Sequence, residues 1–438
     1  MKRKNSLLFL IILLLSQLNF AQDFKIENDR NKFSVYFQDV GNLIIVPISI
    51  NGSVPLNFAI DTGSPYTIIT NLNAIRHFQL KKGNSVTISG LGKDIMNLEA
   101  YLSKNNSIQI GKATSETTDI VLLFEEGFDL SSRFGIPIYG ILGYDILKDF
   151  VVKVNYVQKK ITFYNPEYFH SRTRLNKYTI IPLEIRGKKP YLKLDSQINN
   201  KNVELNLLID TGSSEALWLF ENPENQIVIS GPFIEDYLGY GLNGEIHGKK
   251  TRIPQLNLGK YQLENLTTSF PDSISIANIA RINRNGTVGS EVLRRFTTIY
   301  DYRNRNLYVK KNKYFKDEYH YNLAGLELYQ PYPDLPYLEV AYIRKGSPAY
   351  KAGLKKGDAI RLVNEKKISV FRVNQFQEKF DAQESNVIYV EGKKRESITL
   401  PEIIELFKSK VGEKIHIVYT REESDVERTA SFVLKKSI

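Results

Sequence analysis

Short apolar runs separated by turn residues make up most of the chain. Across residues 33–58, apolar stretches alternate with turns at Gly41-Asn42 and Asn51-Gly52. Runs of this length, bounded by glycine, asparagine and serine, are typical of β-strands joined by tight turns. The pattern therefore predicts a mainly β fold.

The pattern also repeats. The tetrapeptide Asp-Thr-Gly-Ser occurs at residues 61–64 and again at residues 210–213, each time directly after an apolar run. Farther along, residues 141–147 align with residues 287–293, and the apolar positions that follow recur at a constant offset. Because an internal duplication of this length determines the architecture, the sequence predicts two homologous β lobes.

Few segments have helical spacing. Residues 144–150 and 291–296 follow the aligned glycine of each repeat and predict short helices. Residues 400–409 are amphipathic, and Pro401 near their start suits the first turn of a helix. Helices are therefore expected to be a minor part of the fold.

The N-terminus has the pattern of a secretory signal peptide. Residues 1–21 combine a basic start, a short apolar run and a small residue at Ala21. The apolar run is short for a membrane span and is interrupted by Ser16 and Gln17. An uncleaved anchor is the alternative. We expect an exported protein, periplasmic, in the cell envelope or secreted, with a loose polar start at residues 22–32.

Composition adds mainly exclusions. Hydrophobic residues make up 42% of the chain, enough for a large core, and the absence of cysteine excludes disulfides and cysteine-ligated zinc. The net charge is +11, but the basic residues are dispersed, whereas a nucleic-acid-binding module needs a basic stripe. The five histidines show no metal-ligand spacing. We expect no metal, no cofactor and no nucleic-acid partner.

The two tetrapeptides carry the candidate chemistry. One aspartate is a common residue, but Asp61 and Asp210 are delivered by the same strand-to-turn device. Two carboxyl groups held together can share one proton and activate a water molecule between them. Such a pair hydrolyses a peptide bond without a covalent intermediate. The sequence leaves open which aspartate is the base.

Each half resembles a retropepsin-type aspartic protease lobe, and the two halves together resemble the bilobal aspartic peptidases of the pepsin and fused-retropepsin kind. The resemblance extends from Phe33 to Lys313. It implies that two threonines interlock the catalytic loops, that two glycines allow close approach, and that two serine hydroxyls donate to the outer carboxylate oxygens. Such donors favour the ionised form and hence activity at acidic pH. The implied support residues are Thr62, Gly63, Ser64, Thr211, Gly212 and Ser213.

The same resemblance implies flaps, which are hairpins that close over a substrate. Glycine-rich hairpins follow each tetrapeptide, and tips with little steric restriction suit a segment that must open and close. Plain surface hairpins are the alternative. The candidate tip residues are Gly90, Leu91, Gly92, Gly241, Leu242 and Gly244.

The tail is a different module. Residues 346–360 contain Ser-Pro-Ala, Ala-Gly-Leu and Gly-Asp-x-Ile in that order, and they resemble the central signature of bacterial PDZ domains. The resemblance implies strand addition by a peptide and capture of its terminal carboxylate. An internal docking module is the alternative, and residues 369–397 are predicted to be an insertion. The implied carboxylate-binding loop contains Gly325, Leu326, Glu327 and Leu328.

The sequence thus predicts a mainly β protein with two homologous aspartic-protease β lobes and a C-terminal PDZ domain, built of strands with short helices. We interpret it as an exported, monomeric aspartic endopeptidase acting on polypeptides, with peptide C-termini as candidate ligands of the tail. The alternative is a catalytically inactive peptide-binding or adaptor protein. The expected units are a signal peptide, two lobes and the tail, at residues 1–21, 22–170, 171–316 and 320–438.

Overall fold

The structure is a computed structural model of the whole chain. It describes residues 24–71, 78–94, 98–123, 128–279, 283–370, 397–421 and 424–438. The predicted signal peptide and most of the predicted insertion lie outside the described residues. The described residues form four β-sheets and a few short helices, so the predicted mainly β class is confirmed.

Strand β5 (Leu56–Ile60) lies at the centre of the first lobe. It is parallel to β10 (Gly140–Leu142) and antiparallel to β4 (Leu43–Ile50). The end of β5 is buried between these apolar strands. The chain then leaves the sheet at Asp61. Among the described residues the same sheet contains β1 (Lys25–Ile26), β3 (Gln38–Val40), β6 (Ile68–Ile69), β7 (Ser85–Ile88), β8 (Leu98–Ile110) and β9 (Ala113–Leu123).

The second lobe repeats this arrangement. Strand β16 (Lys201–Ile209) lies between the parallel strand β21 (Gly286–Val288) and the antiparallel strand β15 (Lys189–Ile198). Asp210 follows β16 as Asp61 follows β5. The described remainder of this sheet consists of β14 (Glu184–Arg186), β17 (Leu217–Leu219), β18 (Ile234–Gly241), β19 (Gly244–Leu258) and β20 (Tyr261–Pro271).

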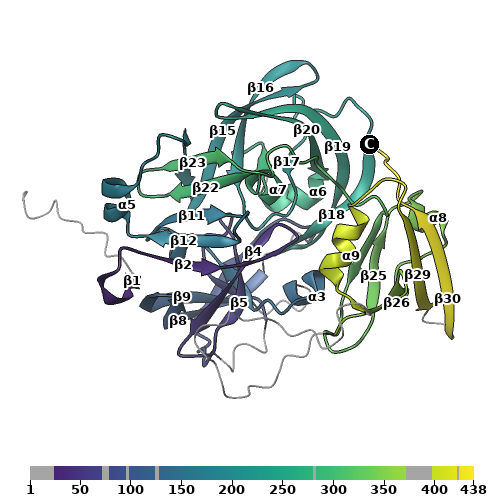
Figure 1. Cartoon of the computed structure of the whole chain (residues 1–438), viewed down its shortest axis with the longest axis horizontal. Coiled ribbons are helices and arrows are strands. Elements are labelled where there is room, and N and C mark those ends of the chain that lie inside the picture. Colours follow the sequence, from purple (N-terminus) through teal and green to yellow (C-terminus); the bar gives the residue numbers. More distant parts are fainter. Residues whose placement is uncertain are drawn as a thin grey trace, which may run out of the picture.

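A third sheet joins the lobes. Strand β11 (Val151–Asn155) of the first lobe pairs with β22 (Phe296–Asp301) of the second, and β2 (Lys32–Tyr36) forms one edge (Figure 1). The shared sheet makes the two lobes one body and thereby sets the relation between the two aspartate loops. Its other strands in the described residues are β12 (Lys160–Tyr164), β13 (Thr179–Pro182) and β23 (Asn306–Lys311).

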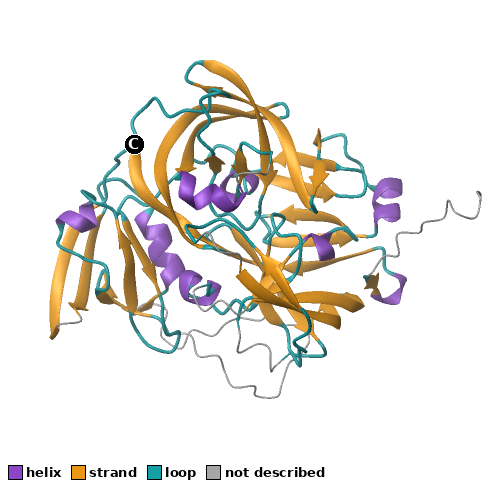
Figure 2. Ribbon diagram, turned by 180° about the vertical axis from the view of Figure 1, so that it is seen from behind, coloured by secondary structure: helices purple, strands orange, loops and turns teal. Residues whose placement is uncertain are grey.

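The tail has a hydrophobic core of its own, separate from the core that the two lobes share. Helix α9 (Leu400–Phe407) covers one side of its sheet (Figure 2). A capping box between Thr399 and Glu402 begins the helix. The described strands of the sheet are β24 (Leu326–Tyr329), β25 (Leu338–Ile343), β26 (Ala359–Val363), β27 (Lys366–Ile368), β28 (Ser397–Ile398), β29 (Lys414–Arg421) and β30 (Ser424–Val433).

The remaining helices are short. The predicted helices after the aligned glycines exist as α4 (Tyr144–Leu147) and α7 (Ser290–Leu293), but they end early, because the chain then enters the shared sheet. In the part of the chain that the structure describes, no helix has the length and apolarity needed to cross a membrane. The others are η1 (Glu27–Asp29), α3 (Leu130–Phe134), α5 (Pro166–Arg172), α6 (Ser273–Ile276), η2 (Ala277–Ile279) and α8 (Pro348–Lys351).

The prediction of a loose start at residues 22–32 is wrong for residues 24–32. Phe24 is only 1% exposed, and its ring lies 5.7 Å from that of Phe150. Strand β1 pairs with β9, and Lys32 already belongs to the shared sheet. Burial of one aromatic side chain and two strand pairings outweigh the polar composition of this segment.

Candidate active site

Two threonines join the aspartate loops of the two lobes. The Thr62 hydroxyl donates to Ile209 O over 2.7 Å and accepts from the Thr211 N–H over 3.1 Å. The Thr211 hydroxyl donates to Ile60 O over 2.8 Å and accepts from the Thr62 N–H over 3.1 Å. Both threonines are buried, so these four hydrogen bonds are shielded from water and hold the loops in register.

Asp61 and Asp210 meet between these threonines, and a hydrogen bond joins their side chains. A Cβ atom at Gly63 would lie 2.8 Å from Asp210 Cγ, and one at Gly212 would lie 2.5 Å from Asp61 Cγ. Each glycine N–H also donates to the aspartate of its own loop, over 2.7 Å and 2.9 Å. Any larger residue would therefore push the two carboxyl groups apart.

The environment of the pair favours a retained proton. Burial raises the pKa of Asp61 well above its usual range, and both the charge of Asp210 and the hydrogen bond to it raise the pKa further. Two like charges this close cannot both ionise readily, so the pair releases its protons in two separate steps. One carboxyl group can then donate a proton while the other accepts one.

The two serines do not behave as the resemblance implies. The Ser64 hydroxyl donates to Tyr66 O over 2.8 Å, so the prediction that it donates to Asp61 is wrong. Ser213 Oγ lies beside Gly289, and no hydrogen bond joins it to Asp210 within the described residues. The predicted preference for acidic pH therefore loses its physical basis.

One acidic residue in each of the helices α4 and α7 forms hydrogen bonds that stabilise the aspartate loops. Asp145 accepts from the N–H of Thr67 over 2.8 Å and from its hydroxyl over 3.0 Å. Burial raises the pKa of Asp145 to about 6, while these hydrogen bonds act in the opposite direction. A carboxyl group in the first lobe thus fixes the chain just after Ser64.

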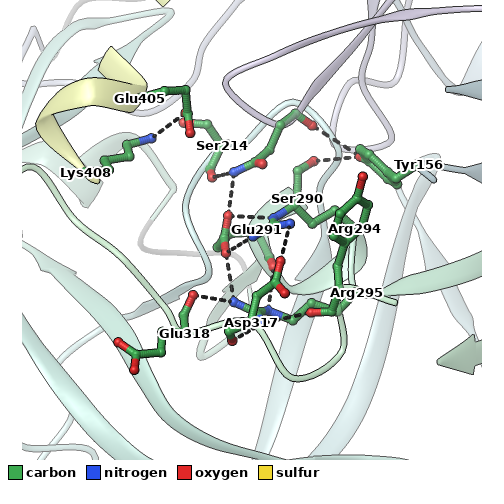
Figure 3. Close-up of polar contacts among 12 residues, drawn as sticks. Tyr156, Ser214, Ser290, Glu291, Arg294, Arg295, Asp317, Glu318, Glu405 and Lys408 are labelled. Carbon is green, nitrogen blue, oxygen red and sulfur yellow. Dashed lines mark hydrogen bonds and ion pairs between the residues drawn. The ribbon is translucent and has the colours of Figure 1, made fainter. Parts of the chain in front are cut away.

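Glu291 has the equivalent place in the second lobe but different partners (Figure 3). It accepts from Arg294 over 3.0 Å and from Arg295 over 2.8 Å. It also accepts from Nδ2 of Asn42, over 2.7 Å, and the same amide donates to Ser214 O over 3.1 Å. The β3–β4 hairpin of the first lobe therefore holds the aspartate loop of the second.

The predicted flap tips lie against one another. Gly90 N–H donates to Asn243 Oδ1 over 2.6 Å, and Asn243 N–H donates to Leu91 O over 2.9 Å. Asp94 N–H donates to Asn243 O over 3.0 Å. The contact includes all six predicted tip residues, Gly90, Leu91, Gly92, Gly241, Leu242 and Gly244.

The flaps also exchange side chains. Leu91 of the first flap packs in a cluster with Trp218, Leu238 and Ile246 of the second lobe. Leu242 of the second flap packs in the reciprocal cluster of the first lobe. The two hairpins are therefore closed on each other by apolar contacts as well as by hydrogen bonds. Sequence reasoning identified the tips but not this exchange.

Sequence reasoning missed two basic residues beside the aspartates. Lys189 begins β15 and Arg284 precedes β21, and both side chains are half-buried. The charge of Lys189 acts on Asp61 and Asp210, and that of Arg284 acts on Asp210. A signal was present in the alignment of the halves, because the first lobe has Leu43 at the start of β4, where the second has Lys189.

The tail module docks on the flap hairpin of the second lobe. Arg344 Nη1 and Asp236 Oδ2 form an ion pair at 2.8 Å, and each side chain is 4% exposed. The rings of Tyr237 and Tyr342 stack with centroids 5.7 Å apart. The ion pair is therefore almost fully withdrawn from water at the contact.

The predicted carboxylate-binding loop, residues 325–328, lies near this contact. Gly325 N–H, which such a loop would offer to a peptide, already donates to Asn322 Oδ1 over 2.9 Å. Just beyond the loop, Gln330 N–H donates over 2.7 Å to Ser132 O in the first lobe. Part of the strand edge that a peptide would use is therefore occupied by the chain itself.

No group of three or more His, Cys, Asp or Glu side chains suited to a metal ion occurs within the described ranges. The two aspartate carboxyl groups can activate a water molecule between the lobes. The two hairpins can close over it.

Comparison with known proteins agrees with this site. Residues 46–146 match the family model described as aspartyl protease, and this segment contains the first aspartate loop and β10. This segment of the chain is therefore similar to the aspartyl protease family, in agreement with the resemblance predicted there. No curated protein matches the chain.

The chain is also similar to solved structures. One is the crystal structure of aspartic proteinase from Irpex lacteus, with a TM-score of 0.45 and 12% identity over 65% of this chain and 99% of that one. Another is the crystal structure of Basic 7S globulin from soybean, with a TM-score of 0.39 and 8% identity over 66% of this chain and 97% of that one.

Proposed function

We propose that this protein is an aspartic endopeptidase that hydrolyses polypeptides with water activated by Asp61 and Asp210. The observation that carries the proposal is the hydrogen-bonded pair of carboxyl groups, held by reciprocal threonine bonds between the lobes. An intact Asp-Thr-Gly-Ser in both halves argues against a catalytically inactive protein.

The mechanism assigns different roles to the two carboxyl groups. Asp61, whose pKa is raised by burial and by its neighbour, holds the shared proton and donates it to the carbonyl oxygen of the substrate. Asp210 takes a proton from the attacking water. The tetrahedral intermediate, now a gem-diol, then collapses: Asp210 gives that proton to the leaving nitrogen, the C–N bond breaks, and Asp61 takes back a proton from one of the two hydroxyl groups. The flaps must part before a polypeptide can enter, because their tips are bonded to each other.

We further propose that residues 320–438 form a PDZ-like module that docks internally. The buried ion pair with the second flap and the bond from Gln330 to the first lobe support docking over capture of a free peptide. We also propose that the protein is exported, because residues 1–21 have the pattern of a signal peptide.

Cleavage of denatured casein by the purified protein tests the function. Asp61→Asn and Asp210→Asn should each abolish pepstatin-sensitive cleavage, because neither can share a proton as the parent pair does. Asp195→Asn, an exposed aspartate on β15, is the matched control and should cleave normally. Equal cleavage by all four proteins would show that the pair is not catalytic.

The second candidate is an adaptor whose tail binds partners while the lobes act only as a scaffold. The separate hydrophobic core of the tail favours it. Parent protein that binds C-terminally free peptides, releases them on amidation and never cleaves casein would support this function.

A further inference from the structure

Two basic side chains in the second lobe lack partners. No described residue forms a hydrogen bond or an ion pair with the side chain of Lys189 or Arg284. Arg284 Nε is buried, and its guanidinium group only lies 5.4 Å from the ring centroid of Phe220. Nearby Arg186, by contrast, has Glu184 as an ion-pair partner at 3.0 Å.

Leaving these cations unpaired is costly. Burial lowers the pKa of Lys189, and the neighbouring charge of Arg284 lowers it further. Burial likewise lowers the pKa of Arg284. Charged groups withdrawn from water are normally paired or hydrogen-bonded. The charges of Asp61 and Asp210 act on these cations, but no described carboxylate forms an ion pair with either of them. Two adjacent cations without an ion-pair partner therefore indicate a place where an anionic group binds.

The place is beside the catalytic carboxyl groups. The turn before Lys189 crosses to the first lobe, where Lys188 Nζ lies 4.4 Å from the ring centroid of Tyr66. The segment that carries Arg284 is fixed to the same hairpin, because Arg186 Nη1 donates to Asn283 O over 2.9 Å. Strand β15 runs antiparallel to β16 with Tyr191 opposite Leu208, so the register puts Lys189 level with Asp210. Lys189 and Arg284 thus form one wall of the second lobe, with Lys189 beside the aspartate pair.

The first lobe shows that the fold does not require cations here. Leu43 has the place of Lys189 directly after the equivalent hairpin, and Ile138 has the place of Arg284 two residues before the equivalent strand. Both are buried in an apolar cluster with Val40. The same scaffold is therefore stable with an apolar wall, and the basic wall is a property of the second lobe alone.

We propose that Lys189 and Arg284 form a subsite for a carboxylate group of the substrate, next to the bond that is cleaved. This inference rests on the proposed function, since it places the carboxylate in a polypeptide held at the aspartate pair. The carboxylate belongs either to an Asp or Glu side chain or to a free C-terminus near the cleaved bond. In both cases the recognising chemistry is a pair of charge-assisted hydrogen bonds.

Matched peptides test the subsite. We would measure kcat/KM for peptides that carry Glu, Gln or Lys at each position flanking the cleaved bond, each with a free and an amidated C-terminus. The parent should prefer Glu over Gln by about tenfold at one position on the second-lobe side. A preference for the free over the amidated peptide would instead identify the C-terminal carboxylate.

Variants connect that preference to the wall. Lys189→Met should remove most of the preference for the carboxylate, and Lys189→Glu should transfer the preference to Lys peptides. Lys193→Met, which removes an exposed lysine of the same strand, should keep the parent preference. The gain of Lys preference distinguishes a lost subsite from a misfolded protein. Cleavage without any preference for carboxylate would overturn the inference and leave the proposed function intact.

A binding measurement separates the two claims. The Asp210→Asn variant is titrated with the Glu and Gln peptides, and the titration is repeated with Lys189→Met added. If the parent protein cleaves no peptide but the Glu peptide binds Asp210→Asn more tightly through Lys189, the subsite stands and the hydrolase fails. Equal affinities together with no cleavage by the parent would refute both.

Discussion

The two lobes share a scaffold but differ in what they place around the aspartates. In the first lobe the wall beside the site is apolar, with Leu43 and Ile138 buried. In the second lobe the equivalent positions carry Lys189 and Arg284. The comparison teaches that the two halves share the aspartate loops, whereas the proposed selectivity comes from positions at which the halves differ.

The hairpins that reach from one lobe to the other also differ between the lobes. Asn42 of the first lobe donates hydrogen bonds to Ser214 and Glu291 of the second. Lys188 of the second lobe places a charge over the ring of Tyr66 in the first. Each hairpin contacts the opposite aspartate loop, but one does so with a neutral amide side chain and the other with a cation.

The largest difference to test is the docking of the tail on the second flap. Arg344→Met leaves Asp236 buried without its partner, so the free energy of unfolding should fall by about 3–5 kcal/mol. Denaturant unfolding measures this loss. The control is Arg303→Met, which breaks the exposed pair with Glu167 and should cost less than about 1 kcal/mol. Equal losses would mean that the flap is not anchored through this pair.

The same contact should respond to pH through Glu327. Burial raises the pKa of Glu327 from 4.5 to about 7, and the charge of Asp236 adds to the rise. The folded state then holds a proton that the unfolded state has lost, so stability should fall between pH 4.5 and about 7. The fall should be on the order of 3 kcal/mol. Glu327→Gln should remove it, and unfolding at about pH 3.5 and about pH 8, each about one unit outside the steep range, measures the difference. A variant as pH-dependent as the parent would contradict the assignment.

The threonine bonds test where the lobes are alike. Thr62→Val and Thr211→Val each remove a buried hydroxyl that donates to one strand and accepts from the other loop. Each should lower kcat by about 10- to 100-fold, corresponding to about 1–3 kcal/mol. The hydrogen bonds of Thr62 and those of Thr211 have nearly the same lengths, so the two variants should lose the same factor in kcat. Thr62→Ser keeps the hydroxyl and serves as the control. A loss of kcat in only one of the two variants would show that the two threonines do not contribute equally.

The flaps test a smaller asymmetry. Asn243 of the second flap bonds Gly90 through its side chain, and Asn243→Ala should speed amide hydrogen exchange at Gly90 by about tenfold. Asn278→Ala, which removes an exposed bond to Asp94, should leave exchange at Gly90 unchanged. Equal exchange in all three proteins would show that Asn243 does not hold the flaps together.

Sequence patterns predicted what local chemistry determines. An apolar strand followed by Asp-Thr-Gly-Ser placed Asp61 and Asp210, and the capped amphipathic run placed α9 within two residues of its end. They could not predict features that depend on tertiary packing. Lys189 and Arg284 come together only because the β14–β15 hairpin packs on the segment before β21, where Arg186 donates to Asn283 O. Ser64 donates its hydroxyl to Tyr66 O within its own loop.

The most direct test of the account is a titration of Asp61 and Asp210 by carbon-13 NMR of their carboxyl groups. The account predicts two separate steps, with one proton retained well above the usual range of aspartate, and collapse to a single step in Asp210→Asn. Two carboxyl groups that each lose a proton independently, at the ordinary value and without response to that substitution, would contradict it.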